Sequence, residues 1–326
     1  MKEEIFVKLS ELKKLSQNAP MSYKQMDQVR LHEYFSELGL LYDNFYQELE
    51  MESPYVDTHM DVSFSNAHLQ FHSHSFYELI CCRNTCGAEY LVGTERYKLQ
   101  KGDIIFVPPD ISHRPLLPEH VSEPYKRDVL WINTDFLHSI VQTDSSQSVE
   151  KYAKPVLYRT AGTRWEYICD LFRSGVQEAE QQDTGWETIL IANTLTILTH
   201  LRRAGMDMHA EPLKAEKPEL LDQVLAYVEL HLSEKITLAD MAHQFFISES
   251  TITQTFRKKM GVSFYRCVTQ RRLIAAKVLI ERGFPMDSVA EQVGFSDYSS
   301  FFRAFKQEYG ISPRQYRKKQ TGSDAK

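Results

Sequence analysis

The last hundred residues carry the same helical pattern twice, and this duplication restricts the fold of the C-terminal region more than any other feature of the chain. In the first copy, apolar residues stand at i, i+3, i+4 and i+7 from Leu238 and then at steps of four from Ile252. The second copy repeats this arrangement from Met286 and from Phe301. Each series is the apolar stripe of an α-helix, and the two series of one copy are separated by too few residues for anything except a tight turn. The pattern predicts two helix-turn-helix units.

The residues at the predicted helix ends support these units. Thr237 and Ser248 are good N-cap residues for the two helices of the first unit, and Gly261 and Gly310 follow the last apolar position of each unit. Between the units, Ser263–Arg282 has no internal Pro or Gly and is expected to form one helix of roughly 30 Å, at about 1.5 Å per residue. Two recognition helices held that far apart suit successive major grooves, because one turn of DNA is about 34–36 Å.

The charge distribution favours DNA binding over a plain helical bundle. Residues 219–320 contain 15 Lys+Arg and 11 Asp+Glu, a net charge of +4; because the whole chain carries −6 and residues 321–326 cancel, residues 1–218 carry −10. Cations near helix ends suit phosphate contacts, which supply affinity without sequence information. Complementing the helix macrodipole is the alternative explanation, but it does not account for the duplicated unit. The basic positions are Arg257, Lys258, Lys259, Arg271, Arg272, Arg314, Arg317, Lys318 and Lys319.

An ordered set of motifs gives residues 220–318 a family resemblance. The motifs are Thr237–Ala242, Phe256–Gly261, Arg272–Leu279, Val293–Asp297, Phe301–Lys306 and Ser312–Arg317. With these residues, the last third of the chain resembles the DNA-binding domain of the AraC/XylS transcription regulators. The resemblance implies a reader of double-stranded DNA with two helix-turn-helix units.

Base readout is expected from the early, outward positions of each recognition helix, because they reach the groove while the apolar stripe stays in the core. Gln254 is the best-motivated of these, since an amide can bond adenine in two places. Phe302 fits either a thymine methyl or an extra core contact with Phe301, and Arg303 fits guanine, a phosphate or a nearby carboxylate. The expected base-reading set is Ser250, Thr253, Gln254, Tyr298, Ser299, Phe302 and Arg303. The expected phosphate-binding set is Arg257, Lys258, Lys306, Arg314 and Arg317.

Short β-rich segments follow one another from about Val56 to Trp131, which predicts a small barrel or jelly roll. Glycines at 87, 93 and 102 and the pair Pro108–Pro109 mark its corners. The expected strands are 76–82, 88–92, 95–99, 103–107 and 128–132.

Two stretches of this region, Phe71–Glu78 and Gly102–His113, resemble the two cupin motifs. In enzymatic cupins the equivalents of His72, His74, Glu78 and His113 hold a divalent metal; in the AraC-type sensors that this arrangement resembles, such residues often form part of a ligand pocket without metal. The chain departs from the fuller cupin pattern, with Asp110 where glycine is usual and Leu117 where asparagine is usual. We therefore expect His72, His74, Glu78 and His113 to line a ligand pocket, with a metal site or purely structural hydrogen bonding as the alternatives.

Two helical stretches, about Arg164–Gln182 and Trp186–Arg203, follow the barrel. The second is more apolar than a surface helix needs. The helices at this place form the dimer contact in related sensors, and packing onto the barrel of the same subunit is the competing interpretation. Residues 1–55 suggest amphipathic helices that pad the barrel, extend the dimer surface or close over a ligand.

The expected fold class is α+β: an N-terminal helical extension (1–55), a small cupin-like β-barrel that senses a ligand (56–160), a helical dimerisation segment (161–205), a linker (206–218), and an all-α domain with two helix-turn-helix units (219–320). The two functions are expected in separately cored domains. The resulting hypothesis is a ligand-responsive transcription regulator, not an enzyme, that acts as activator or repressor. A metal-dependent cupin enzyme tethered to DNA is the alternative.

The expected partners are double-stranded DNA, a small-molecule effector such as a carbohydrate, a second copy of the chain, and RNA polymerase if the regulator is an activator. No cofactor is expected, apart from the divalent metal of the alternative. No run of eighteen apolar residues and no signal-peptide layout occurs, and the five cysteines suit a reducing compartment rather than a disulfide framework. We therefore expect a cytoplasmic location and no membrane partner.

Overall fold

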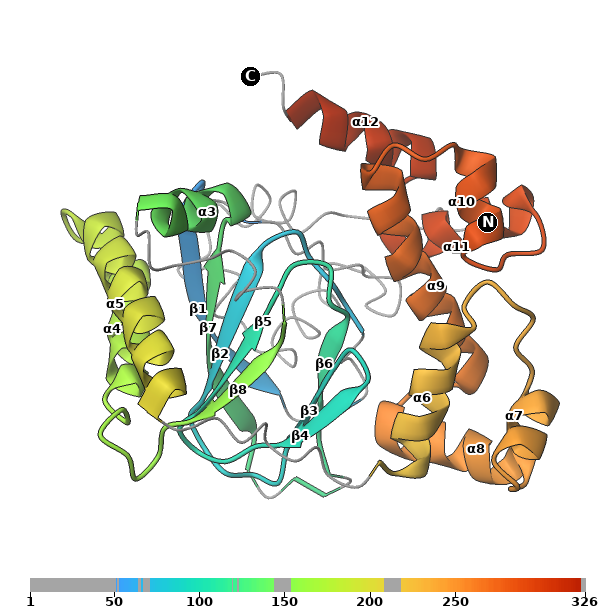
Figure 1. Ribbon diagram of the computed structural model, residues 1–326, viewed down its shortest axis with the longest axis horizontal. Helices are drawn as coiled ribbons and strands as arrows, with labels where there is room; N and C mark the ends of the chain where they lie inside the picture. The colour runs from blue at the N-terminus through green and yellow to red at the C-terminus, as the bar shows by residue number, and fades with distance from the viewer. Residues whose placement is uncertain are drawn as a thin grey trace, which may run out of the picture.

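The computed structural model describes residues 51, 53–63, 66, 71–118, 120–121, 123–143, 154–207 and 218–323. Most of the predicted N-terminal extension (1–55) and of the predicted linker (206–218) lies outside these residues. The rest forms a β-domain with helices on one side and a wholly helical C-terminal domain beside it, which confirms the α+β class (Figure 1). Among the described helices, none combines the length and the apolar character needed to cross a membrane.

The β-domain consists of two antiparallel sheets. The larger has the strand order β1-β7-β2-β5-β8 and the smaller the order β4-β3-β6. The predicted strands correspond to β2, β3, β4, β5 and β7, whereas β1, β6 and β8 were not predicted. The strands are β1 (Val56–Ser63), β2 (Tyr77–Cys82), β3 (Glu89–Val92), β4 (Glu95–Lys98), β5 (Asp103–Val107), β6 (His113–Leu116), β7 (Tyr125–Ile132) and β8 (Val156–Arg159).

Strands β2 and β5 of the larger sheet are buried on both faces, which explains why they read as continuous apolar runs. Alternate residues of β2 enter two different cores. Leu79 and Cys81 face a core shared with the helices, whereas Ile80 and Cys82 face the barrel interior with Tyr90 and Tyr125. The barrel interior is therefore closed by the smaller sheet on the side opposite the helices.

Helices α3 (Thr134–Thr143), α4 (Ile168–Gln181) and α5 (Trp186–Asp207) cover the outer face of the larger sheet (Figure 1). Gly175 lets α4 and α5 approach closely, because a Cβ built there would lie 3.2 Å from Leu190 Cδ1. Helix α3 falls inside the predicted barrel segment and had no counterpart in the sequence prediction.

The C-terminal domain contains both predicted helix-turn-helix units. The first unit is α7 (Leu238–Gln244) and α8 (Glu249–Thr255), continued by a π-helical turn, η4 (Phe256–Met260). The second is α10 (Met286–Gln292) and α11 (Tyr298–Tyr309), and the connecting helix α9 (Phe264–Glu281) lies between the units. Helices α6 (Leu220–Leu230) and α12 (Pro313–Ser323), which were not singled out from the sequence, flank the two units.

The helix ends lie where the capping residues predicted them. Thr237 and Ser248 accept hydrogen bonds from the backbone N–H groups of Asp240 and Thr251, respectively. Gly261 and Gly310 take the left-handed conformation, with φ of 68° and 70°. These local signals explain why the unit boundaries were readable from the sequence.

The hydrophobic cores do not follow the predicted domain division. The second unit has its own core around Phe301 and Phe305. The core of the first unit, by contrast, includes Phe71, Leu91 and Leu116 of the β-domain. The expectation of two separately cored domains is therefore wrong for the first unit, which is packed against the smaller sheet.

Helix α5 yields a prediction about stability. Leu198 is 7% exposed in the core between α5 and the larger sheet, whereas Leu195 on the same helix is 36% exposed. We expect Leu198→Ala to lower the free energy of unfolding by about 2–5 kcal/mol, because it removes buried methyl groups and leaves a cavity. Leu230→Ala on α6, whose side chain is 81% exposed, is the matched control and should change it by less than about 0.5 kcal/mol. Urea unfolding followed by tryptophan fluorescence checks both, and equal losses would contradict the assignment of Leu198 to the core.

Candidate functional site

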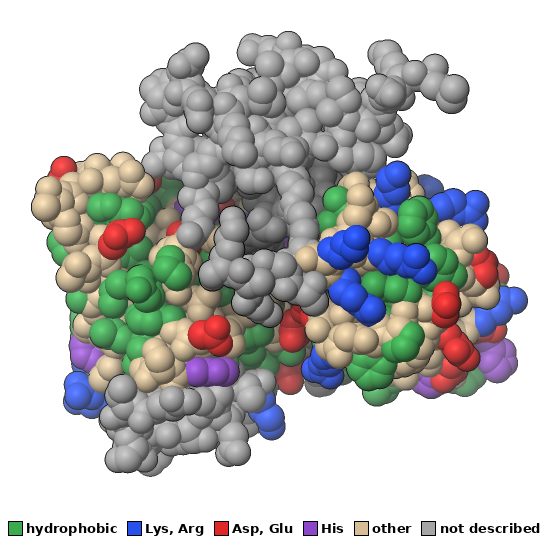
Figure 2. All heavy atoms as spheres, turned by 90° about the horizontal axis from the view of Figure 1, so that it is seen from above, with side chains coloured by type: hydrophobic (Ala, Val, Ile, Leu, Met, Phe, Trp, Pro, Cys, Tyr) green, Lys and Arg blue, Asp and Glu red, His purple; other side chains and the backbone are tan. Residues whose placement is uncertain are grey.

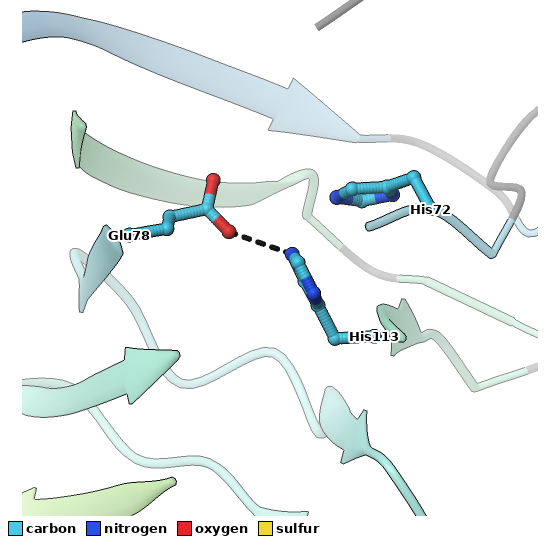
Figure 3. A group of neighbouring side chains, drawn as sticks. All are labelled: His72, Glu78 and His113. Carbon is cyan, nitrogen blue, oxygen red and sulfur yellow. Dashed lines mark hydrogen bonds and ion pairs between the residues drawn. The ribbon is translucent and has the colours of Figure 1, made fainter. Parts of the chain in front are cut away.

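Three of the four predicted pocket residues converge inside the barrel. His72 precedes β2, Glu78 lies on β2 and His113 begins β6, and their candidate ligand atoms all lie within 4.8 Å of one another (Figure 3). His72 and His113 are also joined by an isolated antiparallel bridge. The fourth residue, His74, is buried, and its Nε2 lies 3.5 Å from Glu78 Oε2. We call His72, His74, Glu78 and His113 the polar cluster.

Backbone carbonyls set the ring orientations of two histidines. His113 Nδ1 lies 2.7 Å from the carbonyl oxygen of Ile111, and His74 Nδ1 lies 2.8 Å from that of Phe76. Because a carbonyl only accepts, both Nδ1 atoms carry a proton and both Nε2 atoms face Glu78. His113 Nε2 is 2.7 Å from Glu78 Oε2, so a proton must lie between these two atoms.

Trp131 completes the coordination of the carboxylate and was missed from the sequence. Its indole Nε1–H donates to Glu78 Oε1 at 2.9 Å. The two residues face each other in the register of β2 and β7. Only the strand pairing identifies Trp131 as a partner, because nothing in its own sequence neighbourhood points to Glu78.

A second polar group lies on β1 and β7. The Arg127 guanidinium donates to Asp61 at 2.8 Å and to Ser63 Oγ at 3.0 Å. Burial alone would raise the pKa of the Asp61 carboxyl, but Arg127 and His59 beside it hold that pKa well below its usual range. The interior thus offers both a fixed carboxylate and a fixed cation to a polar ligand.

The hydrogen bonds of the polar cluster also shift its titration. Burial would raise the pKa of Glu78, but its hydrogen bond with His113 and the nearby His74 hold it well below the ordinary value of 4.5. Burial lowers the pKa of His74 below its ordinary value of 6.5, against the opposing hydrogen bond with Glu78. The cluster is therefore built around an ionised carboxylate.

The residues of the polar cluster fit a divalent metal in donor type. Two imidazoles with Nδ1 bonded to carbonyls and a nearby carboxylate match the usual arrangement of metal-binding histidines. However, the direct hydrogen bond between His113 and Glu78 occupies the very atoms that a metal would need. A metal would have to displace the shared proton and separate the two side chains.

The two departures from the cupin pattern have structural explanations. Asp110 has a φ of 64°, the left-handed conformation that glycine adopts most readily, so the backbone kept this shape without the glycine. Leu117 is buried in the apolar part of the barrel interior, where the usual asparagine would place an amide.

The predicted DNA-facing residues lie on α8, η4, α11 and α12. On α8, Ser250 and Gln254 are exposed and Thr253 is half-buried, and on α11 the pair Ser299 and Arg303 is exposed. Tyr298 and Phe302 are half-buried, with ring centroids 6.2 Å apart. Figure 2 shows that, on the face it presents, most Lys and Arg side chains lie over the C-terminal domain.

The predicted phosphate-binding residues differ in their surroundings. Arg257, Lys258, Lys306 and Arg314 are exposed. Arg317 is half-buried and donates to the carbonyl oxygen of Phe284.

Two arginines of the connecting helix, which the sequence grouped with the basic charges, bind protein groups in the structure. Arg272 donates to the carbonyl oxygens of Leu232 and Glu234. Arg271 is buried and donates to Ser112 Oγ at 2.8 Å and to the carbonyl oxygen of Gly93 at 3.0 Å. Arg271 thus contacts the β-domain, a role that only the packing of distant segments reveals.

The carboxylate of the polar cluster yields a pH prediction. A carboxyl whose pKa is depressed in the folded state stabilises the fold above its unfolded pKa, and this contribution is lost as the pH falls. We expect the free energy of unfolding to decrease as the pH is lowered from 4.5. In the Glu78→Gln variant this decrease should be smaller, because the ionisable group is absent. At pH 7 the same variant should be about 1–3 kcal/mol less stable, because it weakens a buried, charge-assisted network. Urea unfolding at pH 7 and pH 4 measures both, and an identical acid slope in the variant would contradict an ionised Glu78.

Comparison with known proteins agrees with this geometry. A family model described as "Helix-turn-helix domain" matches residues 241–319. The protein named "Probable transcriptional regulator LumQ" from Photobacterium leiognathi is 29% identical over 197 residues, which cover 57% of this chain and 77% of LumQ. The HTH-type transcriptional activator RhaS of Salmonella typhimurium is 25% identical over 259 residues, 78% of this chain and 88% of RhaS.

Among solved structures, ToxT from Vibrio cholerae is 14% identical, covers 82% of this chain and 98% of its own, and has a TM-score of 0.38. The family match covers the two helix-turn-helix units that the structure contains, and the relatives named above are transcriptional regulators. Residues 241–319 therefore form a helix-turn-helix domain, and the chain is similar to known transcriptional regulators over more than half of its length.

Proposed function

We propose that the chain is a ligand-responsive regulator that reads a specific DNA sequence through both helix-turn-helix units and senses a small molecule inside the barrel. One observation carries the DNA-binding half of this proposal. The two helix-turn-helix units are connected by a single 18-residue helix, α9. The recognition helices α8 and α11 both have side-chain N-caps, and their outward positions are accessible. At about 1.5 Å per residue α9 is about 27 Å long, which suits recognition helices in adjacent major grooves.

Base readout is assigned to the N-terminal and outward positions of α8 and α11. Gln254 presents an exposed amide, and Arg303 presents an exposed guanidinium that suits a guanine edge. Thr253 is less available, because its hydroxyl donates to the carbonyl oxygen of Glu249 at 2.9 Å. Ser250, Tyr298, Ser299 and Phe302 complete the proposed reading surface.

Phosphate binding is assigned to the exposed cations near or after the ends of the same helices. Arg257 and Lys258 lie on η4, which continues α8, Lys306 lies near the end of α11, and Arg314 lies at the start of α12. Arg317 is retained in the proposal with a second role, since its guanidinium also fixes the loop before α10 through Phe284.

The sensing half of the proposal rests on the polar cluster and the Asp61–Arg127 pair. Together they offer carboxylates, a guanidinium and imidazoles on an otherwise apolar interior with aromatic walls. Such a lining suits a small polar molecule with several hydroxyl groups, and a carbohydrate is our candidate. The proposal places the chain in the cytoplasm, as a homodimer that contacts RNA polymerase if it activates transcription.

A dimer contact through α5 has one supporting observation. Ile189 and Leu195 are exposed apolar side chains on this helix. Leu198, the other residue of interest there, is buried against the barrel and belongs to the fold of one subunit. In this proposal the exposed Ile189 and Leu195 contribute to the dimer contact, whereas Leu198 packs within one subunit.

A metal-dependent cupin enzyme is the second candidate, and the convergence of His72, Glu78 and His113 is the observation in its favour. Elemental analysis of full-length chain purified without chelator separates the candidates. The regulator proposal expects less than one Zn, Fe or Mn per ten chains. A stoichiometric metal that resists dialysis would favour the enzyme.

The DNA-reading surface yields a prediction with matched variants. On a duplex selected from a random library by the full chain, Gln254→Ala should weaken binding by about 1–3 kcal/mol and relax preference at one base pair. Arg257→Ala should weaken selected and random duplexes alike and reduce the salt dependence of binding by about one unit of slope. Gln292→Ala on α10 is the control for Gln254, since it removes an exposed amide outside the recognition helices. Fluorescence anisotropy at several salt concentrations measures these effects.

The polar cluster yields a prediction about the effector. In a thermal-shift screen of the full chain against sugars and other small polar metabolites, an effector should raise the melting temperature, because it binds the native state only. His113→Ala should abolish that rise while circular dichroism shows that the variant is folded. A metabolite that stabilises parent and variant equally would remove the polar cluster from the binding site.

A further inference from the structure

The smaller sheet is a single layer of strands between the polar cluster and the C-terminal domain. Successive residues of a strand point to opposite faces. In β6, His113 faces the barrel interior, whereas Ser112 just before it and Arg114 just after it face the C-terminal domain. Phe71 and His72 divide in the same way, because Phe71 belongs to the core of the first helix-turn-helix unit.

The outer face of the smaller sheet makes specific polar contacts with the C-terminal domain. Arg114 donates to the carbonyl oxygen of Met260 at 3.0 Å, and Arg271 donates to Ser112 Oγ at 2.8 Å. The Arg271 guanidinium also lies over the ring of Phe71, 3.7 Å from its centroid. Arg114 and Arg271 are 1% and 2% exposed, so both cations are held entirely within the contact.

A third arginine ties the far strand of the same sheet to α6. Arg96 on β4 binds both carboxylate oxygens of Asp222, at 3.1 and 3.0 Å, and lies 3.1 Å from Glu219. Arg96 also pairs with Glu89 of the β-domain at 2.8 Å. Removing its charge would leave Glu89 and Asp222 without their arginine partner, while Glu219 would keep its ion pair with Lys259, and this disfavours the contact.

The recognition helices lie outside this contact. The contact uses α6, the end of η4 and α9, whereas α7, α8, α10 and α11 lie on the side of the C-terminal domain away from the β-domain (Figure 1). Ser250, Gln254, Ser299 and Arg303 accordingly stay exposed while the contact is made. The contact therefore fixes the position of the C-terminal domain against the β-domain and leaves the proposed base-reading residues exposed.

We propose that the smaller sheet transmits the state of the polar cluster to the DNA-binding domain within one subunit, through Ser112 and Arg114 on either side of His113. This inference rests on the proposed function. When a ligand separates His113 from Glu78 by shifting β6, the side chains of Ser112 and Arg114, which bind α9 and η4, change position as well. Coupling of this kind is reciprocal, so DNA binding also changes the polar cluster.

A double-mutant cycle on the full chain tests the proposal without a known effector. Glu78→Gln alters the polar cluster, Arg96→Gln opens the contact at a distance from it, and the duplex is the one selected from a random library by the parent chain. We expect Glu78→Gln to change the Kd at least fivefold in the parent, within the range usual for allosteric coupling, and less than twofold in the Arg96→Gln background. Arg159→Gln is the matched control, because it removes an Arg–Asp ion pair with Asp103 on the larger sheet. The fivefold effect should persist in that background.

Two further measurements keep the test decisive. If Arg96→Gln does not fold, as judged by circular dichroism, Ser112→Ala replaces it. This variant removes only the hydroxyl that accepts from Arg271 and leaves the Gly93 carbonyl oxygen as acceptor. The reciprocal measurement uses Trp131, the only tryptophan left after Trp165→Phe and Trp186→Phe. Adding the duplex should change its fluorescence in this chain and not in the chain that also carries the contact variant.

The outcomes distinguish the inference from the proposed function. Equal effects of Glu78→Gln in all backgrounds, or no effect in any, would overturn transmission through the smaller sheet while DNA binding stays intact. A parent chain that prefers no duplex over random DNA would overturn the proposed function itself.

Discussion

Each residue of β6 can point to only one of two sides, and this constraint ties the interior of the β-domain to the C-terminal domain. His113 takes the inner side and completes the polar cluster with Glu78. Ser112 and Arg114 then have to take the outer side, where they bind α9 and η4. The same four-residue strand thus belongs to two sites, and neither can be rearranged without moving the other.

The contact between the smaller sheet and the C-terminal domain buries the guanidinium groups of Arg114 and Arg271. A guanidinium taken out of water is costly unless its donors are bonded and its charge is balanced. Arg271 meets this requirement in part, with Ser112, Gly93, Glu229 and the ring of Phe71, whereas its buried Nε has no hydrogen-bond partner among the described residues. Arg114 has a carbonyl partner at Met260 but no carboxylate partner among the described residues, and burial lowers its pKa to about 10. Arg114 is therefore the cation of the contact that is least compensated.

The shared core changes how the two functions relate. Domains with separate cores joined by a linker move independently by default. Here Leu91 and Leu116 of the smaller sheet lie in one cluster with Val224 and Met260 of the C-terminal domain. The second helix-turn-helix unit, with its own core around Phe301 and Phe305, has no such attachment to the β-domain among the described core residues. The first unit is consequently the one through which the β-domain holds the reader.

The amino-acid sequence by itself determined the duplicated reader, because helical periodicity, N-caps such as Thr237 and Ser248, and the left-handed positions of Gly261 and Gly310 are local properties of the chain. It also indicated the four residues of the polar cluster, through their resemblance to a known motif. Only the tertiary structure decided what surrounds them. Trp131 reaches Glu78 through strand pairing, and Arg271 reaches Ser112 across 159 positions of sequence, contacts that no periodicity encodes. The physical reason is that local sequence does not distinguish an arginine that will be buried from one that will bind DNA. Only the packing of distant segments determines which guanidinium stays in contact with water.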